Sequence, residues 1–365
     1  MALLPLGHSN VSDLVREELG NFFNIIDNLF VVYSVKVKSP YYLNFPAPRQ
    51  ILIPWIVAGL AALLYTWILW QIPFEGIKDR GNYLSYPRRS EIILYRLGQG
   101  TVVHLFANEP LWLWVNSIGY QLISSDSIVR FVIAVGSFPT ALVVLRQRIE
   151  AKHFWFLVFI LFFIPVLKNY IVHLRQGMAI GVFLAFWAIG NRKWTAVGLG
   201  VAALIHASFF VVGVVWLVAW FFSTLKARTF TRLALYAGLG VLLSLSLGQI
   251  ASFLGARQAA ALEGEVVLNI SGLGFLFWLF IFSGFLWTGI SFVRKHSFEI
   301  GMLVFYLSNY FITPFSARIL ESAIVPILLM VPKTNPKARV WLFAAFAFYM
   351  TWNIIQRSQI QNFGF

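Results

Sequence analysis

Apolar runs of roughly membrane-spanning length recur along almost the whole chain, and short polar loops separate them. Of the 365 residues, 59% are hydrophobic and 17% are aromatic. A soluble domain could not bury so much apolar surface and still present a polar exterior. We therefore expect an all-α, polytopic membrane protein.

About 11 transmembrane helices (10–13) are expected, in one integral membrane domain over residues 1–365, because no long linker divides the chain. The expected spans cover residues 51–70, 127–145, 153–168, 175–190, 194–206, 207–222, 233–254, 272–293, 300–312, 319–331 and 340–353. Several are shorter than the roughly 20 residues that a hydrocarbon core requires. These are expected to extend into loops, to thin the bilayer, or to be half-helices that line a cavity.

The basic residues predict the orientation. A net charge of +14 would by itself suit a nucleic-acid-binding protein. However, the lysines and arginines concentrate in every second loop, at Arg146, Arg148, Lys152, Arg192, Lys193, Lys226, Arg228, Arg232, Arg294, Lys295, Lys333, Lys337 and Arg339. The positive-inside rule places these loops in the cytoplasm, so topology accounts for the charge and no nucleic acid is expected as a partner.

The remaining loops are then external: residues 71–126, 169–176, the break at His206, 255–271 and 313–318. The same rule disfavours external arginines, so Arg175, Arg257 and Arg318 are candidates for function. The alternative is that each one snorkels to lipid headgroups or caps a helix. Because no acidic residue lies between Glu150 and Glu263, Arg175 is expected to stand unpaired, with its charge left for a ligand.

Two stretches do not fit the pattern of spans. Residues 92–125 hold two moderately apolar segments split by Ala107-Asn108-Glu109-Pro110. If both segments crossed the membrane, the turn between them would be cytoplasmic, yet it carries an acidic residue and no basic one. We therefore expect short interfacial or re-entrant helices within an external segment, residues 71–126. Residues 1–50 are expected to form a cytoplasmic-side amphipathic segment, since Asp27 interrupts their apolar stretch.

Signatures of soluble enzymes are missing: the sequence has no GxGxxG, no Walker loop and no HExxH. The chain has no cysteine, which excludes disulfides and thiolate metal sites. Glu263-Gly-Glu265 could hold a divalent ion but has no histidine nearby, and no metal is expected. The Gly-Leu-Gly sequences at 198–200, 238–240 and 272–274 indicate close helix packing more than phosphate binding.

The external arginines suit a lipid-linked diphosphate, because a guanidinium makes paired, charge-assisted hydrogen bonds to phosphate oxygens. His206 interrupts the run VAALIHASFF and is a candidate general base, the alternative being a helix-end histidine bonded to a carbonyl. His173 competes for this role, although two-residue spacing on a helix would turn it away from Arg175. His104 is a third candidate.

Four features occur in order along residues 50–330. Asp79-Arg-Gly-Asn-Tyr83 follows the first span, and Glu109-Pro110 opens a tryptophan-rich segment that ends at Asn116. Leu174-Arg175-Gln176-Gly177 starts a helix, Ile205-His206-Ala207-Ser208 forms the external break, and Arg318 precedes a late span. In this order the features resemble the O-antigen and exopolysaccharide polymerases of the Wzy/EpsG type. The long N-terminal segment departs from that pattern.

The resemblance implies a GT-C-like, metal- and nucleotide-independent membrane glycosyltransferase without a cofactor. Such an enzyme joins undecaprenyl-diphosphate-linked oligosaccharide repeat units on the periplasmic face of the bacterial inner membrane. It also implies membrane lipid and a chain-length regulator protein as partners. Arg175 and Arg318, together with Arg257, would bind the donor diphosphate, while His206 would deprotonate or orient the acceptor hydroxyl. The further candidates for substrate binding are Gln176, Glu109, Asp79, Tyr83 and His173. Glu109 and Asp79 could contact sugar hydroxyls, the alternative being that each carboxylate stabilises its loop.

Three other functions remain open from the sequence. A flippase for lipid-linked oligosaccharides would need charges through the depth of several spans and two related halves, and no clear internal repeat is present. An O-antigen ligase would differ from a polymerase only in its acceptor. A membrane acyltransferase could also use an embedded histidine.

Overall fold

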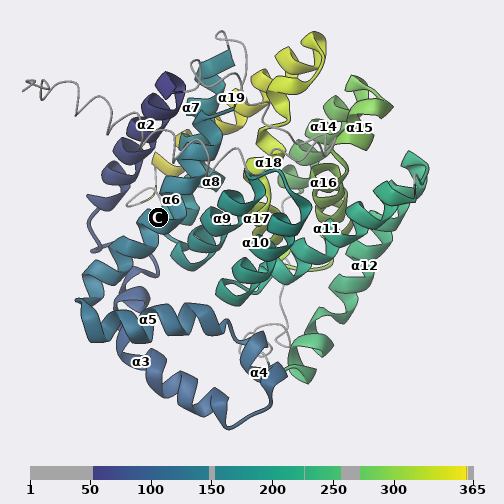
Figure 1. The fold of residues 1–365 in the computed structure, drawn as a ribbon. Helices are drawn as coiled ribbons and strands as arrows, with labels where there is room; N and C mark the ends of the chain where they lie inside the picture. The colour runs from purple at the N-terminus through teal and green to yellow at the C-terminus, as the bar shows by residue number, and fades with distance from the viewer. Residues whose placement is uncertain (1–51, 148–152, 226, 256–271, 359, 361–365) are drawn as a thin grey trace, which may run out of the picture. The chain divides into compact units, whose positions relative to one another are not determined.

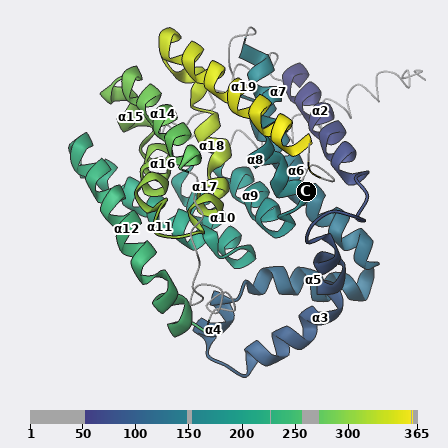
Figure 2. The same cartoon turned by 180° about the vertical axis from the view of Figure 1, so that it is seen from behind.

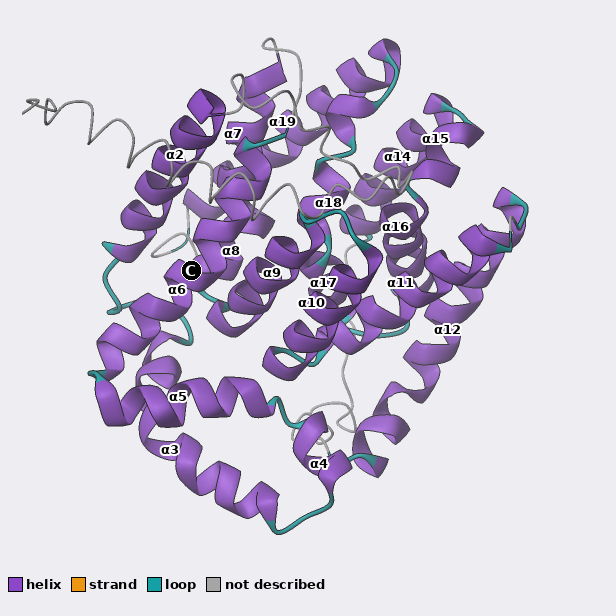
Figure 3. Cartoon of the chain, viewed as in Figure 1, coloured by secondary structure: helices purple, strands orange, loops and turns teal. Residues whose placement is uncertain are grey.

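The computed structural model describes residues 52–147, 153–225, 227–255, 272–358 and 360, and all the secondary structure in them is helical (Figures 1 and 3). The helices are α2 (Leu52–Trp70), α3 (Arg80–Gly98), α4 (Val102–Ala107), α5 (Pro110–Leu122), α6 (Ser125–Leu145), α7 (Phe154–Phe162), α8 (Ile164–Ile171), α9 (Leu174–Trp187), α10 (Arg192–Ile205), α11 (Ser208–Thr224), α12 (Thr229–Phe253), α14 (Leu273–Thr288), α15 (Ile290–Lys295), α16 (Ser297–Asn309), α17 (Ser316–Ser322), α18 (Ile324–Leu328), the 3₁₀ helix η3 (Val331–Lys333) and α19 (Pro336–Ser358). The expected N-terminal amphipathic segment lies outside the described residues.

Each of the expected spans coincides with one helix or with two or three consecutive helices. Within the described part of the chain, three helices are long and apolar enough to cross a membrane alone: α6, the Thr229–Ser246 portion of α12, and α19. α7 and α8, bent by 46° where they meet, make a fourth candidate if they count as one span. Further apolar helices, among them α9, α11 and α14, are shorter. Length and composition thus indicate a helical membrane protein.

The outward surfaces of several helices are apolar. On α2, the side chains of Ile56, Leu60 and Trp67 are 52%, 62% and 59% exposed. Each large apolar side chain left in water forfeits about 1.5–3 kcal/mol relative to burial. A contiguous surface of this kind is therefore expected to face lipid.

Close helix packing fixes where α9 begins. A Cβ on Gly177 would collide with the carbonyl oxygen of Asn169 in α8, and a Cβ on Gly181 would collide with the carbonyl oxygen of Gly136 in α6. These small residues let α9 lie directly against both neighbours. The start of α9, which carries Arg175, is therefore held against the core.

The segment between α2 and α6 folds as three helices, and α3 lies beside α5 in both views (Figures 1 and 2). Arg80 anchors the start of α3: its side chain is fully buried, and its Nε donates to the carbonyl oxygen of Ile171, 2.7 Å away at the end of α8. Residues 79–83, which were expected in an external loop after the first span, are thus the start of a helix.

Candidate active-site cavity

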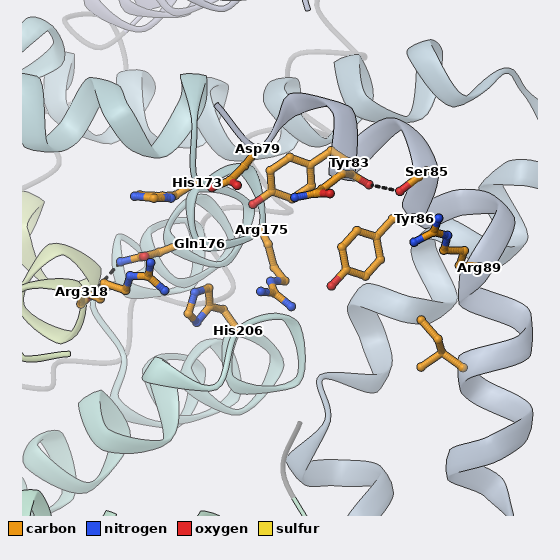
Figure 4. Close-up of a pocket in the computed structure, with 12 residues that line it drawn as sticks. Asp79, Tyr83, Ser85, Tyr86, Arg89, His173, Arg175, Gln176, His206 and Arg318 are labelled. Carbon is orange, nitrogen blue, oxygen red and sulfur yellow. Dashed lines mark hydrogen bonds between the residues drawn. The ribbon is translucent and has the colours of Figure 1, made fainter. Parts of the chain in front are cut away.

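A cavity of about 380 Å³ lies among α3, the start of α9, the α10–α11 turn and α17 (Figure 4). Its lining side chains belong to Asp79, Asn82, Tyr83, Ser85, Tyr86, Arg89, Ile93, His173, Arg175, Gln176, His206 and Arg318. Three arginines and one carboxylate are in this set, so the lining favours an anionic ligand. The structure therefore brings together seven residues that the sequence singled out: Asp79, Tyr83, His173, Arg175, Gln176, His206 and Arg318.

Arg175 is paired, so the expectation of an unpaired charge was wrong. Its NH1 donates to Oε2 of Glu109 in a short, charge-assisted hydrogen bond. The expectation considered acids near Arg175 in sequence, whereas the partner comes from the N-cap of α5, 66 positions earlier. A guanidinium in a poorly solvated site needs such a counter-charge. The guanidinium also lies over the ring of Tyr86, with its Cζ 6.0 Å from the ring centroid.

Glu109 lies behind the cavity lining. Its side chain has no exposed surface, and its Oε1 accepts the backbone N–H of Ala207 at 3.0 Å, at the start of α11. The carboxylate therefore joins the starts of α5, α9 and α11. Of the two roles expected for Glu109, this geometry favours structural support over contact with a sugar hydroxyl.

Asp79 and Glu109 are the two residues other than glycine with positive φ in the described part of the chain, at 64° and 59°. Backbone strain of this kind costs about 1–3 kcal/mol and often persists at functional sites. Each residue precedes a helix, α3 and α5 respectively. The left-handed backbone at these positions sets where each helix begins.

His173 contributes to the same cavity as Arg175, contrary to the expectation from helical spacing. It is the N-cap of α9, with φ −98° and ψ 57°, so its side chain does not follow the helix. Burial lowers the pKa of His173 to about 3. The ring is therefore neutral at physiological pH.

His206 occupies the turn between α10 and α11, in an extended backbone conformation. Its Nδ1 accepts the backbone N–H of Ser208 at 3.2 Å and lies 3.1 Å from the Oγ of the same serine. Burial lowers the pKa of His206 to about 4, although the nearby Glu109 carboxylate opposes that shift. The His206 ring lies between Arg175 and Arg318 (Figure 4).

Gln176 has a structural contact at the edge of the cavity. Its Nε2 donates to the backbone oxygen of Arg318 at 2.8 Å and to Oγ of Ser322 at 3.1 Å. The residue is 1% exposed. Gln176 thereby positions α17, and with it the Arg318 side chain that lines the cavity.

Sequence reasoning missed five lining residues: Asn82, Ser85, Tyr86, Arg89 and Ile93. Four of them, at positions 82, 86, 89 and 93, follow the 4-3-4 spacing of one helical face. That spacing was available in the sequence, but short helices were expected only within residues 92–125, and none was expected over residues 71–91. Recognising a helix from Arg80 would have placed Arg89 on the same face as Tyr86.

Two other candidates are not part of this lining. His104 lies in α4, and its ring lies so close to Gly255 that a Cβ on that glycine would be 2.7 Å from Cδ2 of the histidine. Arg257, like Glu263 and Glu265, lies outside the described residues.

Comparison of the chain with protein-family models, with curated proteins and with solved structures finds no match.

Proposed function

We propose that this chain is a membrane glycosyltransferase of the O-antigen or exopolysaccharide polymerase type, with a GT-C-like arrangement of about 11 spans. It joins undecaprenyl-diphosphate-linked oligosaccharide repeat units at the periplasmic face of the bacterial inner membrane. The observation that carries the proposal is the convergence of Arg89, Arg175, Arg318 and His206 on one cavity among apolar helices. This arrangement suits a charged headgroup whose hydrophobic tail stays between helices.

The proposed roles follow from the charge that the reaction develops. The acceptor hydroxyl oxygen bonds to the anomeric carbon of the donor, and the bond from that carbon to the diphosphate oxygen breaks. The hydroxyl proton passes to the carboxylate of Asp79, the acidic side chain among the lining residues. The bonding electrons leave with the diphosphate, so its negative charge grows in the transition state. Arg175 and Arg318 stabilise that charge from opposite sides of His206.

Arg175 is suited to this role because Glu109 holds one edge of its guanidinium. Its Nε is buried and has no hydrogen-bond partner among the described residues. An anionic group in the cavity would satisfy this donor. The side chain keeps 23% of its surface accessible, which leaves room for such a contact.

The test uses purified protein in detergent with fluorescently labelled undecaprenyl-diphosphate repeat units. Wild-type protein should lengthen them into a ladder on a gel. Arg175→Lys and Arg318→Lys should lower the rate by about 10²–10³-fold, since an ammonium cannot reproduce the paired guanidinium hydrogen bonds. Arg192→Ala is the matched control, because Arg192 is exposed at the opposite end of α10 from His206.

A transporter cannot lengthen substrates where there is no membrane to cross, so extension in detergent separates the polymerase from a flippase. If the wild-type protein extends nothing, or if Arg175→Lys matches the wild type, the proposal is wrong. Transfer of finished glycan to a lipid-core acceptor, without repeat extension, would point to a ligase.

A further inference from the structure

A chain of hydrogen bonds links α9, α17 and α11 behind the cavity. Gln176 Nε2 donates to Oγ of Ser322 at 3.1 Å, and this Oγ lies 2.8 Å from Oγ of Ser208. Ser208 presents both its hydroxyl and its backbone N–H to Nδ1 of His206, at 3.1 Å and 3.2 Å. His206 therefore ends the chain, and it lines the cavity with a side chain that is 17% exposed.

Elementary chemistry fixes the direction of the bond between Ser208 N and His206 Nδ1. A hydroxyl can reverse its role, but a backbone N–H can only donate. Nδ1 must then offer its lone pair, and the proton of the neutral ring resides on Nε2. If Nδ1 carried a proton, its N–H would point at the Ser208 N–H, and two hydrogen-bond donors would face each other. The Glu109 Oε1 atom is 4.0 Å from Nδ1, too far to accept that proton.

We propose that Ser208 holds His206 as the neutral Nε2–H tautomer, so that His206 donates a hydrogen bond to the diphosphate of the lipid carrier and does not act as the base. This inference rests on the proposed function. A general base at Nε2 would need a lone pair there, and in this tautomer that position carries the proton. Between two arginines, an N–H is complementary to an anion. Ser208 is accordingly a positioning residue, and no proton transfer by His206 is involved.

Paired substitutions separate a donor from a base. His206→Gln keeps an N–H donor at a similar reach but cannot accept a proton, while His206→Ala removes both functions. For a donor, we expect His206→Ala to lower repeat-unit extension in detergent by about 10²–10³-fold, and His206→Gln to retain about a tenth or more of the rate. Equal losses in both variants would show that His206 is a base. Ser208→Ala, which keeps the backbone N–H, should change the rate by less than about tenfold. Ser246→Ala is the matched control, because Ser246 is a half-buried serine of α12 that does not line the cavity.

A second measurement does not depend on activity. Protein labelled with ¹⁵N-histidine gives long-range ¹H–¹⁵N correlations for each ring, and the His206 signals are those absent from the His206→Gln spectrum. At pH 7 we expect an unprotonated Nδ1 and a protonated Nε2. An unprotonated Nε2 would overturn the inference even if the enzyme is active. If wild-type protein extends no substrate, the proposed function fails, while the tautomer is still decided by this spectrum.

Discussion

Arg175 and Glu109 form an ion pair in which the carboxylate is fully buried while the arginine side chain keeps 23% of its surface accessible. The same carboxylate accepts the backbone N–H of Ala207 at 3.0 Å. Glu109 is thus held in place behind the cavity lining, whereas Arg175 reaches the cavity. Electrostatic preorganisation of this kind lets a guanidinium meet developing charge without first reorienting.

Replacing Glu109 should lower both the folding stability and the proposed activity of the protein. Glu109→Gln retains an oxygen for the Ala207 N–H but removes the counter-charge of Arg175, which should cost about 3–5 kcal/mol of folding stability. Repeat-unit extension should fall with it. Unfolding in detergent and the gel assay measure the two effects, with Glu91→Gln on the exposed face of α3 as the control. A Glu109→Gln protein as stable as Glu91→Gln would contradict the supporting role of Glu109.

Adjacent arginines on α3 offer a matched test of the cavity. Both side chains are exposed, but Arg89 lines the cavity and Arg88 does not. We expect Arg89→Ala to raise KM for lipid-linked substrate by about tenfold, equivalent to 1.4 kcal/mol of lost binding, with a smaller effect on kcat. Arg88→Ala should leave both parameters unchanged. Equal effects of the two substitutions would indicate a general effect of surface charge.

Asp79 is the carboxylate among the lining residues of the described cavity. If His206 is a donor, Asp79 can accept the proton that the acceptor hydroxyl releases. Asp79→Asn should then lower kcat by about 10²-fold or more. Asparagine tolerates the left-handed backbone at this position, so folding should be preserved. An unchanged kcat in the Asp79→Asn protein would assign the proton to another acceptor.

Gly177 in α9 is tightly packed and Gly213 in α11 is not, so alanine substitutions at the two positions should differ in their effect on folding stability. Gly177→Ala would drive a Cβ into the Asn169 carbonyl and should destabilise the protein by about 1–3 kcal/mol. A Cβ on Gly213 in α11 meets nothing within 4 Å, so Gly213→Ala should be neutral or stabilising by up to about 1 kcal/mol. Thermal unfolding in detergent compares the two. Similar melting temperatures would argue against this packing.

The lowered pKa of His206 predicts how the stability and the proposed activity of the protein depend on pH. Burial and the positive charges of Arg175 and Arg318 favour the neutral ring, while Glu109 opposes them, and the resulting pKa is about 4. Because an unfolded histidine titrates near 6.5, the folded protein should lose stability as pH falls from about 6.5 toward 4 and keep it above 6.5. Within the stable range, the extension rate should show no titration of His206 between pH 6 and 8. A rate transition near pH 6.5 that disappears in His206→Gln would contradict this prediction.

The sequence by itself determined the helical class of the fold and the positions of the apolar helices, although it did not predict the start of α3 at Arg80. Apolar runs such as residues 127–145 require a helix in a membrane, because the bilayer core leaves no other way to satisfy the backbone. The arrangement of α6, α9 and α11 along the chain was predictable for that reason. Sequence also singled out Arg175, His206 and Arg318, since positive charge and an imidazole are unusual within so apolar a chain.

Only the tertiary structure decided which residues meet. The partner of Arg175 lies 66 positions away, and the bond that fixes the His206 ring depends on the angle at which α11 leaves its turn. Arg89 enters the cavity because α3 starts at Arg80, where a left-handed Asp79 redirects the backbone. Local periodicity predicts a helix and its apolar face, but the packing of distant helices sets side-chain pairing and the tautomer of a ring. Those contacts determine what the cavity can bind.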